Sequence, residues 1–117
     1  MVPRSRIPDI LKEIEKIGGT HGLIIPCFGH AGDGNIHVNV MYDKSRGEFE
    51  RASQAVYDIF QKTVEMKGRI SGEHGIGMTK KDYMTMNLDP ATIKLMQDIK
   101  KAVDPCNILN PGKIFPK

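Results

Sequence analysis

The sequence predicts an α+β domain in which helices pack on a small antiparallel sheet. Three observations lead to this fold class. Apolar residues recur at helical spacing near residues 7–17, 48–67 and 90–103. After the first of these segments, residues 35–42 alternate apolar and polar side chains, as a half-buried strand does. A glycine-rich stretch joins this strand to a preceding apolar run, which is typical of a hairpin.

The composition fits a single globular domain spanning residues 1–117. Hydrophobic residues make up 39% and charged residues 26% of the chain, which are ordinary values for such a domain. The net charge of +3 comes from scattered lysines and arginines, so we expect no nucleic-acid partner. No apolar run approaches about 18 residues, so we expect no membrane span.

The cysteines and the N-terminus indicate where the protein works. Cys27 and Cys106 form no CxxC motif and are too few for a disulfide framework. The first residues show neither a long apolar core nor a small-residue cleavage site, so we expect no signal peptide. Both features favour a reducing, cytoplasmic setting.

The first two predicted elements are a helix and a strand. Ser5 is a candidate N-cap, Pro8 is tolerated in a first turn, and Gly18-Gly19 is expected to end the helix. The apolar run at residues 22–30 contains Pro26, which indicates an edge strand or a bulge.

A second helix is expected from Gly47 to Lys67, with Gly68 at its end. Its predicted buried face consists of Phe49, Ala52, Val56, Ile59, Phe60 and Thr63. A short strand-like piece, a glycine-rich loop and a short helix follow in residues 69–84.

The third helix has clear boundaries. Asp89 is a capping residue, Pro90 suits the first helical position, and Asp104-Pro105 ends the helix. Its predicted buried stripe consists of Ile93, Met96, Ile99 and Val103. The remaining tail, with two prolines and a glycine, is expected to be irregular.

Two histidines flank the glycine-rich turn of the predicted hairpin, one on each side. His37 and Asn39 share one strand face, because side chains alternate with a period of two. If the glycine-rich stretch reverses the chain, His30 returns beside His37 and both could bind one cation. A hairpin whose histidines merely face solvent has about equal weight on this segment alone. His21 stands apart and reads as a surface histidine without a role.

The stretch SGEHGIG adds a carboxylate and another histidine. Glu73 with His30 and His37 would complete a set of two histidines and one carboxylate, which suits Zn²⁺, Mn²⁺ or Fe²⁺. His74 would then be placed to act as a general base. An exposed polar loop is the alternative for this stretch by itself.

Other chemistries have less support. Both glycine-rich stretches read GxxGxG rather than GxGxxG, and no GxxxxGK[ST] is present, so phosphate cradling is disfavoured. A metallohydrolase with Glu73 or His74 as base remains an alternative, as does a metal-binding module without catalysis.

Three motifs together carry a family resemblance. GHAGDGNIHVNV, GRISGEHGIG and DPCNILNPGKIF occur in this order. The chain resembles the C-terminal region of FAD-linked oxidases, the group of the glycolate oxidase FAD-binding subunit, D-lactate dehydrogenase and D-2-hydroxyglutarate dehydrogenase. The resemblance implies the C-terminal part of a cap, or substrate, domain in an enzyme that oxidises a D-2-hydroxy acid to the 2-oxo acid.

The resemblance also implies residue roles. It makes His30, His37 and Glu73 the metal ligands and His74 the base. Asn39 matches a residue that faces the substrate carboxylate, and Asn110 of the NPGK motif is placed near the flavin.

The length departs from the family pattern. An FAD-binding domain, which would hold most of the FAD, is absent from these residues. We therefore expect a C-terminal fragment or a separately encoded subunit that is inactive alone and needs an FAD-binding domain or subunit as partner. The substrate would be a small 2-hydroxy acid, and the electron acceptor is not specified. The expected location is cytoplasmic, with membrane association through partner subunits as an alternative.

Overall fold

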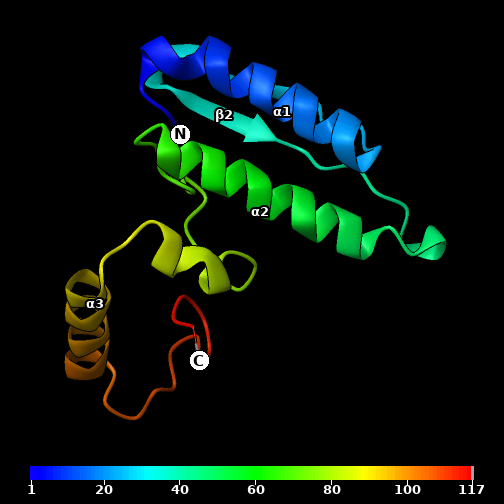
Figure 1. The fold of residues 1–117 in the computed structure, drawn as a ribbon. Helices are drawn as coiled ribbons and strands as arrows, with labels where there is room; N and C mark the ends of the chain where they lie inside the picture. The colour runs from blue at the N-terminus through cyan, green and yellow to red at the C-terminus, as the bar shows by residue number, and fades with distance from the viewer. Residues whose placement is uncertain (117) are drawn as a thin grey trace. The chain divides into compact units, whose positions relative to one another are not determined.

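The chain folds into two compact units, Met1–Gly72 and Glu73–Lys117. The structure is a computed structural model and describes residues 1–116. The first unit contains the helices α1 (Ile7–His21) and α2 (Phe49–Glu65), and the hairpin of β1 (Cys27–His30) and β2 (Asn35–Val38) (Figure 1). The second unit contains α3 (Pro90–Val103). The predicted α+β class with a small antiparallel sheet is confirmed.

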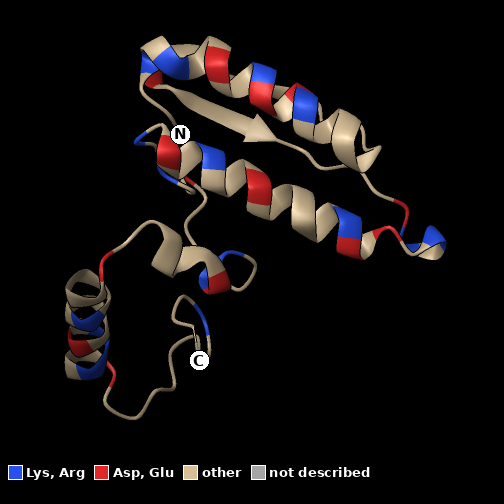
Figure 2. Cartoon of the chain, in the orientation of Figure 1, with Lys and Arg blue, Asp and Glu red and all other residues tan. Residues whose placement is uncertain are grey.

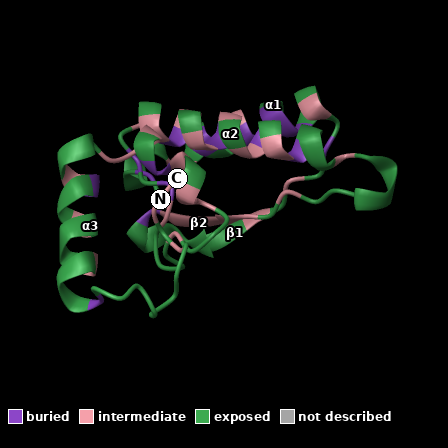
Figure 3. Ribbon diagram, turned by 90° about the horizontal axis from the view of Figure 1, so that it is seen from below, coloured by how far each residue is buried: buried purple, intermediate pink, exposed green. Residues whose placement is uncertain are grey.

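The core of the first unit lies where α1 and α2 pack together against the hairpin. The buried residues of both helices lie along one side of each helix (Figure 3), and charged residues of both signs are distributed along their length (Figure 2). Buried core residues are Val2, Ile10, Ile14, Ile17, Leu23, Ala52, Ala55 and Ile59.

The start of α1 differs in part from the prediction. Ser5 lies in a short 3₁₀ helix, Arg4–Arg6, and Arg6 occupies the N-cap position without a side-chain hydrogen bond. The prediction that Ser5 caps the helix is therefore wrong. Pro8 lies in the first turn as expected, because backbone N–H groups there have no partner within the helix.

The end of α1 also differs, because the helix continues through Gly18 and Gly19 to His21. It ends at Gly22, which adopts the left-handed conformation with φ 62°. Gly18 is required inside the helix, since a Cβ there would lie 2.9 Å from the backbone oxygen of Leu23. Gly18 therefore serves close packing, whereas Gly19 has open space around it, and neither residue ends the helix.

The hairpin has the predicted antiparallel form. Cys27 pairs with Val38 and His30 with Asn35, and the 3₁₀ turn Ala31–Asp33 reverses the chain. Because the sheet has two strands, β1 is an edge strand as Pro26 indicated.

The second helix agrees with its predicted range within two residues at each end. Ala52, Ala55, Ile59 and Thr63 are buried, as the helical spacing indicates. Phe49 was expected in this face, but it is 56% exposed, and its ring lies 6.0 Å from that of Tyr42, measured between centroids.

The strand-like piece expected after α2 does not form. Arg69 exchanges two backbone hydrogen bonds of 2.8 Å with Met1, one donated by each residue. No strand forms over residues 69–71.

In the second unit, α3 has the predicted bounds. The Asp89 carboxylate accepts a 2.9 Å hydrogen bond from the Thr92 amide, and Pro90 begins the helix. The predicted buried stripe is wrong except at Ile93. Met96 is half-buried, and Ile99 and Val103 are 56% and 72% exposed.

Asp104 fixes the chain that follows α3. Its buried carboxylate accepts hydrogen bonds from the Lys100 ammonium and from the amides of Ile108 and Leu109, at 3.0 and 2.9 Å for the amides. The hydrogen bond from Lys100 outweighs desolvation and lowers the pKa of Asp104. The tail is irregular as predicted over residues 106–116, and Lys117 lies outside the described residues.

Other expectations concern cysteines and membranes. Cys27 and Cys106 are free thiols, and burial raises the pKa of Cys27. None of the described helices combines the length and apolar character that crossing a membrane requires.

Candidate metal centre

The hairpin brings His30 and His37 together. In the strand ladder, His30 is opposite Asn35 and His37 is opposite Phe28, so the two histidines are diagonal neighbours. Their ring centroids lie 5.8 Å apart, with the rings nearly perpendicular. The expectation that the turn returns His30 beside His37 is confirmed.

Phe28 is part of this face, although sequence reasoning did not single it out. Its ring lies against the His37 imidazole, with centroids 5.1 Å apart, and Phe28 is 58% exposed. Side-chain alternation along β1 places Phe28 on the same face as His30, and this spacing was its one signal in the sequence.

Asn39 follows β2 by one residue and extends this face. Its amide donates a 3.0 Å hydrogen bond to the Pro26 oxygen, which continues the pairing of the two chain segments past the end of β2. The side chain of Asn39 is exposed and lies two residues beyond His37, as the alternation predicts.

The first unit ends beside this hairpin. A Cβ on Gly72 would lie 2.4 Å from the Asn35 side-chain oxygen, so this position has room only for glycine. Asn35 is also the ladder partner of His30. The peptide bond from Gly72 to Glu73 therefore leaves the first unit next to Asn35, the residue paired with His30 at the end of β1.

Glu73 and His74 begin the second unit, in an exposed loop. The Glu73 carboxylate lies 3.6 Å from Nε2 of His74. Gly75 and Gly77 adopt left-handed conformations with φ 73° and 58°, which allow the loop to turn sharply. An acceptor and an imidazole are thus held side by side on a glycine-rich turn.

Asn110 lies in the exposed part of the tail, in the left-handed conformation with φ 49°. Its backbone oxygen accepts a 3.3 Å hydrogen bond from the Lys113 amide, which closes a turn at the NPGK motif. A place near a flavin remains a prediction for this residue.

His21 is not the free surface histidine expected from the sequence. Its side chain is 15% exposed, and Nε2 lies 2.8 Å from a carboxylate oxygen of Asp58 on α2. Burial alone would raise the pKa of Asp58, but hydrogen bonds from His21 and Gln54 outweigh it and lower the pKa. The partners are 37 residues apart, so no local pattern could reveal the pair.

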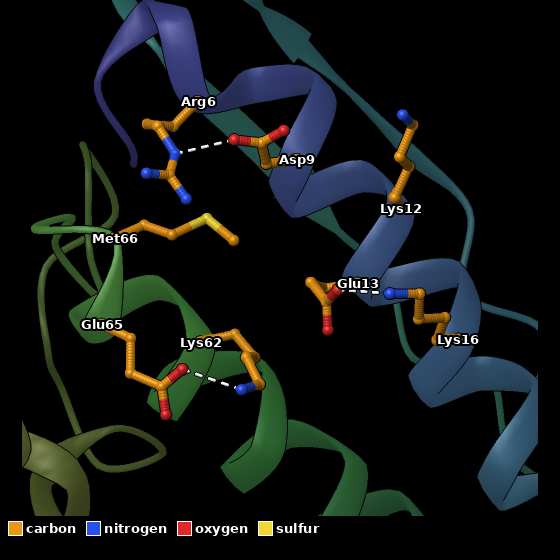
Figure 4. A pocket seen from close by; sticks show the side chains of 8 residues that line it. All are labelled: Arg6, Asp9, Lys12, Glu13, Lys16, Lys62, Glu65 and Met66. Atoms are coloured by element: carbon orange, nitrogen blue, oxygen red, sulfur yellow. Dashed lines mark hydrogen bonds and ion pairs between the residues drawn. The ribbon is translucent and has the colours of Figure 1, made fainter.

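A separate groove between α1 and α2 is lined by charged residues (Figure 4). Its carboxylates are each paired with a basic residue three positions away in the sequence: Asp9 with Arg6, Glu13 with Lys16 and Glu65 with Lys62. Exposed pairs of this kind contribute little to stability, and they leave no carboxylate in the groove for a ligand. We assign no chemistry to it.

Comparison with known proteins extends these observations. Residues 1–114 match the family described as FAD linked oxidases, C-terminal domain. The chain is 46% identical over 117 residues to the Glycolate oxidase subunit GlcD of Bacillus subtilis. This alignment covers 99% of the chain and 25% of the relative. It is 42% identical over 119 residues to the D-2-hydroxyglutarate dehydrogenase of Stutzerimonas stutzeri, covering 95% of this chain and 25% of the relative.

A third relative is the D-lactate dehydrogenase of Anaerostipes hadrus, which is 39% identical over 116 residues and matches 97% of this chain and 24% of its own length. The chain thus spans about a quarter of the length of these curated relatives. The resemblance carried by the three motifs is confirmed, and the chain belongs to the family of FAD-linked oxidase C-terminal domains.

Proposed function

We propose that this chain is the C-terminal part of an FAD-dependent oxidoreductase that oxidises a D-2-hydroxy acid to the 2-oxo acid. The observation that carries the proposal is the family match over residues 1–114. Relatives named for glycolate, D-lactate and D-2-hydroxyglutarate support the substrate class, since all three acids carry a hydroxyl beside a carboxylate.

We further propose that His30, His37 and Glu73 bind one divalent metal. Within the described residues, these side chains form a set whose nitrogen and oxygen atoms could hold one ion. The diagonal histidine pair supports the proposal, because it presents two imidazoles on one face of the hairpin. Two histidines and one carboxylate suit Zn²⁺, Mn²⁺ or Fe²⁺ and leave positions open for a substrate.

In this proposal each remaining residue has a separate task. A metal ion bound here would act as a Lewis acid toward the substrate hydroxyl and carboxylate. His74 takes the hydroxyl proton on its imidazole, whose Nε2 lies 3.6 Å from the Glu73 carboxylate. Asn39 donates from its side-chain amide to the substrate carboxylate, which orients the acid over the hairpin.

The flavin would supply the two-electron acceptor when bound. The glycine-rich stretches at 29–35 and 72–77 do not have the spacing of a dinucleotide-binding loop. Asn110 in the tail is the residue proposed to approach the flavin. We propose that an FAD-binding domain or subunit holds the rest of the cofactor.

A chimera tests the enzyme proposal. The C-terminal quarter of the Bacillus subtilis GlcD relative is replaced by this chain, which 46% identity makes feasible. Rapid mixing then measures flavin reduction by glycolate, D-lactate and D-2-hydroxyglutarate. We expect reduction by at least one acid, and a loss of roughly 10²-fold or more when His74→Ala removes the base.

His21→Ala in the same chimera is the matched control, because it removes a histidine that lies outside the proposed site. Its rate of flavin reduction should stay near that of the parent chimera. A folded, FAD-loaded chimera that none of the three acids reduces would contradict the proposed activity. Wild-type reduction by the His74→Ala chimera would contradict the assignment of the base.

A further inference from the structure

The tail of the second unit folds back onto the loop that follows Glu73 and His74. The Ile114 amide donates a 2.7 Å hydrogen bond to the backbone oxygen of Gly77. The Lys113 ammonium lies 2.8 Å from the sulfur of Met78. Two motifs that are about 35 residues apart in the sequence, SGEHGIG and NPGKIF, are therefore joined within one unit.

The tail is strained at the residue that makes this contact. Ile114 has φ 68°, a left-handed conformation that is rare for a β-branched residue. The Phe115 amide donates a 2.8 Å hydrogen bond to the Lys113 oxygen, so residues 113–115 form a three-residue turn around Ile114. Such strain persists only where surrounding contacts offset it, and it is concentrated at functional sites.

The beginning of the tail, at Ile108 and Leu109, is hydrogen-bonded to the C-terminal end of α3. The Asp104 carboxylate accepts the amides of Ile108 and Leu109, and the Lys100 ammonium donates a 2.7 Å hydrogen bond to the Leu109 oxygen. The tail is thus fixed to α3 at its base and to Gly77 at its tip. Through it, the glycine-rich loop is connected to a regular helix.

We propose that residues 113–115, the tail latch, hold the loop so that Glu73 and His74 keep one position, with Ile114 as the positioning residue. Gly75 and Gly77 give the loop many accessible conformations, and ordering them costs entropy. The hydrogen bond from Ile114 reduces this freedom three residues after His74. The inference rests on the roles proposed above for Glu73 and His74.

Two substitutions at Ile114 test the latch in the 117-residue chain. Ile114→Pro removes the amide donor and forbids a positive φ, whereas Ile114→Gly keeps the donor and accepts a positive φ without strain. We expect the proline variant to shift the amide NMR signals of Glu73 and His74 and to speed hydrogen exchange in residues 75–80. The glycine variant should retain the wild-type signals.

Cobalt binding supplies the functional readout. We expect Ile114→Pro to weaken Co²⁺ affinity about tenfold or more, as loss of a group that orients a ligand does, and to change the visible spectrum of the bound ion. Ile114→Gly should restore both. His21→Ala serves as the control for general destabilisation, and its Co²⁺ spectrum should match that of the wild type.

If Ile114→Pro does not fold, a chain ending at Gly112 takes its place, with the same expected shifts. Unchanged signals of Glu73 and His74 in a chain without the latch would overturn the proposal. A wild-type chain that binds no Co²⁺ would contradict the metal site instead, and the NMR signals of the two residues would still decide whether the latch positions them.

Discussion

Nε2 of His21 lies 2.8 Å from a carboxylate oxygen of Asp58 and thereby joins the last turn of α1 to the middle of α2. The Arg51 side chain adds a 3.2 Å hydrogen bond to the backbone oxygen of His21. The two helices that enclose the core are therefore connected by a polar contact as well as by apolar packing.

Removing this contact should destabilise the first unit. We expect His21→Ala to lower the free energy of unfolding by about 1–2 kcal/mol, because it leaves a partly buried carboxylate without its main donor. Asp9→Asn, which breaks an exposed ion pair with Arg6, should change it by less than about 0.5 kcal/mol. Chemical denaturation at pH 7 compares the two; equal effects would contradict a special role for His21.

The same contact should make stability depend on pH. The pKa of Asp58 is lowered in the folded chain, so its contribution is complete above the ordinary pKa of about 3.9 and is lost as the pH falls through the lowered value. We expect the stability difference between wild type and Asp58→Asn to shrink below about pH 4. Thermal unfolding from pH 3 to 7 measures it; a constant difference would refute the linkage.

Alanine substitutions at two adjacent glycines of α1 should change the stability of the first unit in opposite directions. A Cβ on Gly19 meets nothing within 4 Å, so Gly19→Ala should stabilise the helix by about 0.5–1 kcal/mol. A Cβ on Gly18 would lie 2.9 Å from the Leu23 oxygen, so Gly18→Ala should destabilise the first unit. Melting temperatures of the two variants give the sign directly, and stabilisation by both would show that the backbone can give way at Leu23.

Loss of either hairpin histidine should weaken metal binding. We expect His30→Ala and His37→Ala each to reduce Co²⁺ affinity by about tenfold or more, since each removes a proposed ligand. Isothermal titration of the 117-residue chain measures the affinity, and His21→Ala is the matched histidine control. Wild-type affinity in both hairpin variants would exclude the histidine pair as ligands.

Asp104 should control the order of the tail without affecting the first unit. We expect Asp104→Ala to speed hydrogen exchange at the amides of Ile108 and Leu109 by about tenfold, because their buried acceptor is gone. Exchange in α1 should remain unchanged. Continued protection of both amides in the variant would mean that other groups hold the tail.

Local signals in the sequence were sufficient for several elements. The Asp89-Pro90 start and the Asp104-Pro105 end gave the bounds of α3, because a cap and a proline act on adjacent backbone groups. The end of α1 was missed, since the need for Gly18 comes from contact with Leu23 outside the helix. Local pattern alone could not distinguish a glycine that ends a helix from one that permits close packing.

For the candidate site too, the sequence revealed the local contacts and missed the long-range ones. Strand alternation and the glycine-rich turn placed His30 near His37, because both effects operate over a few residues. The pairing of His21 with Asp58 and the contact of Ile114 with Gly77 connect distant parts of the chain. Tertiary packing decides which residues meet in these contacts, so local sequence patterns could not predict them.

The diagonal placement of His30 and His37 constrains the length of the turn between them more than its composition. A Cβ at Gly32 meets nothing within 4 Å, so the turn itself can accept different side chains. One inserted or deleted residue, however, would shift β2 by one position and turn His37 to the opposite face of the sheet. Among homologous sequences, substitutions should therefore accumulate at Gly32, while insertions and deletions between the two histidines should be absent.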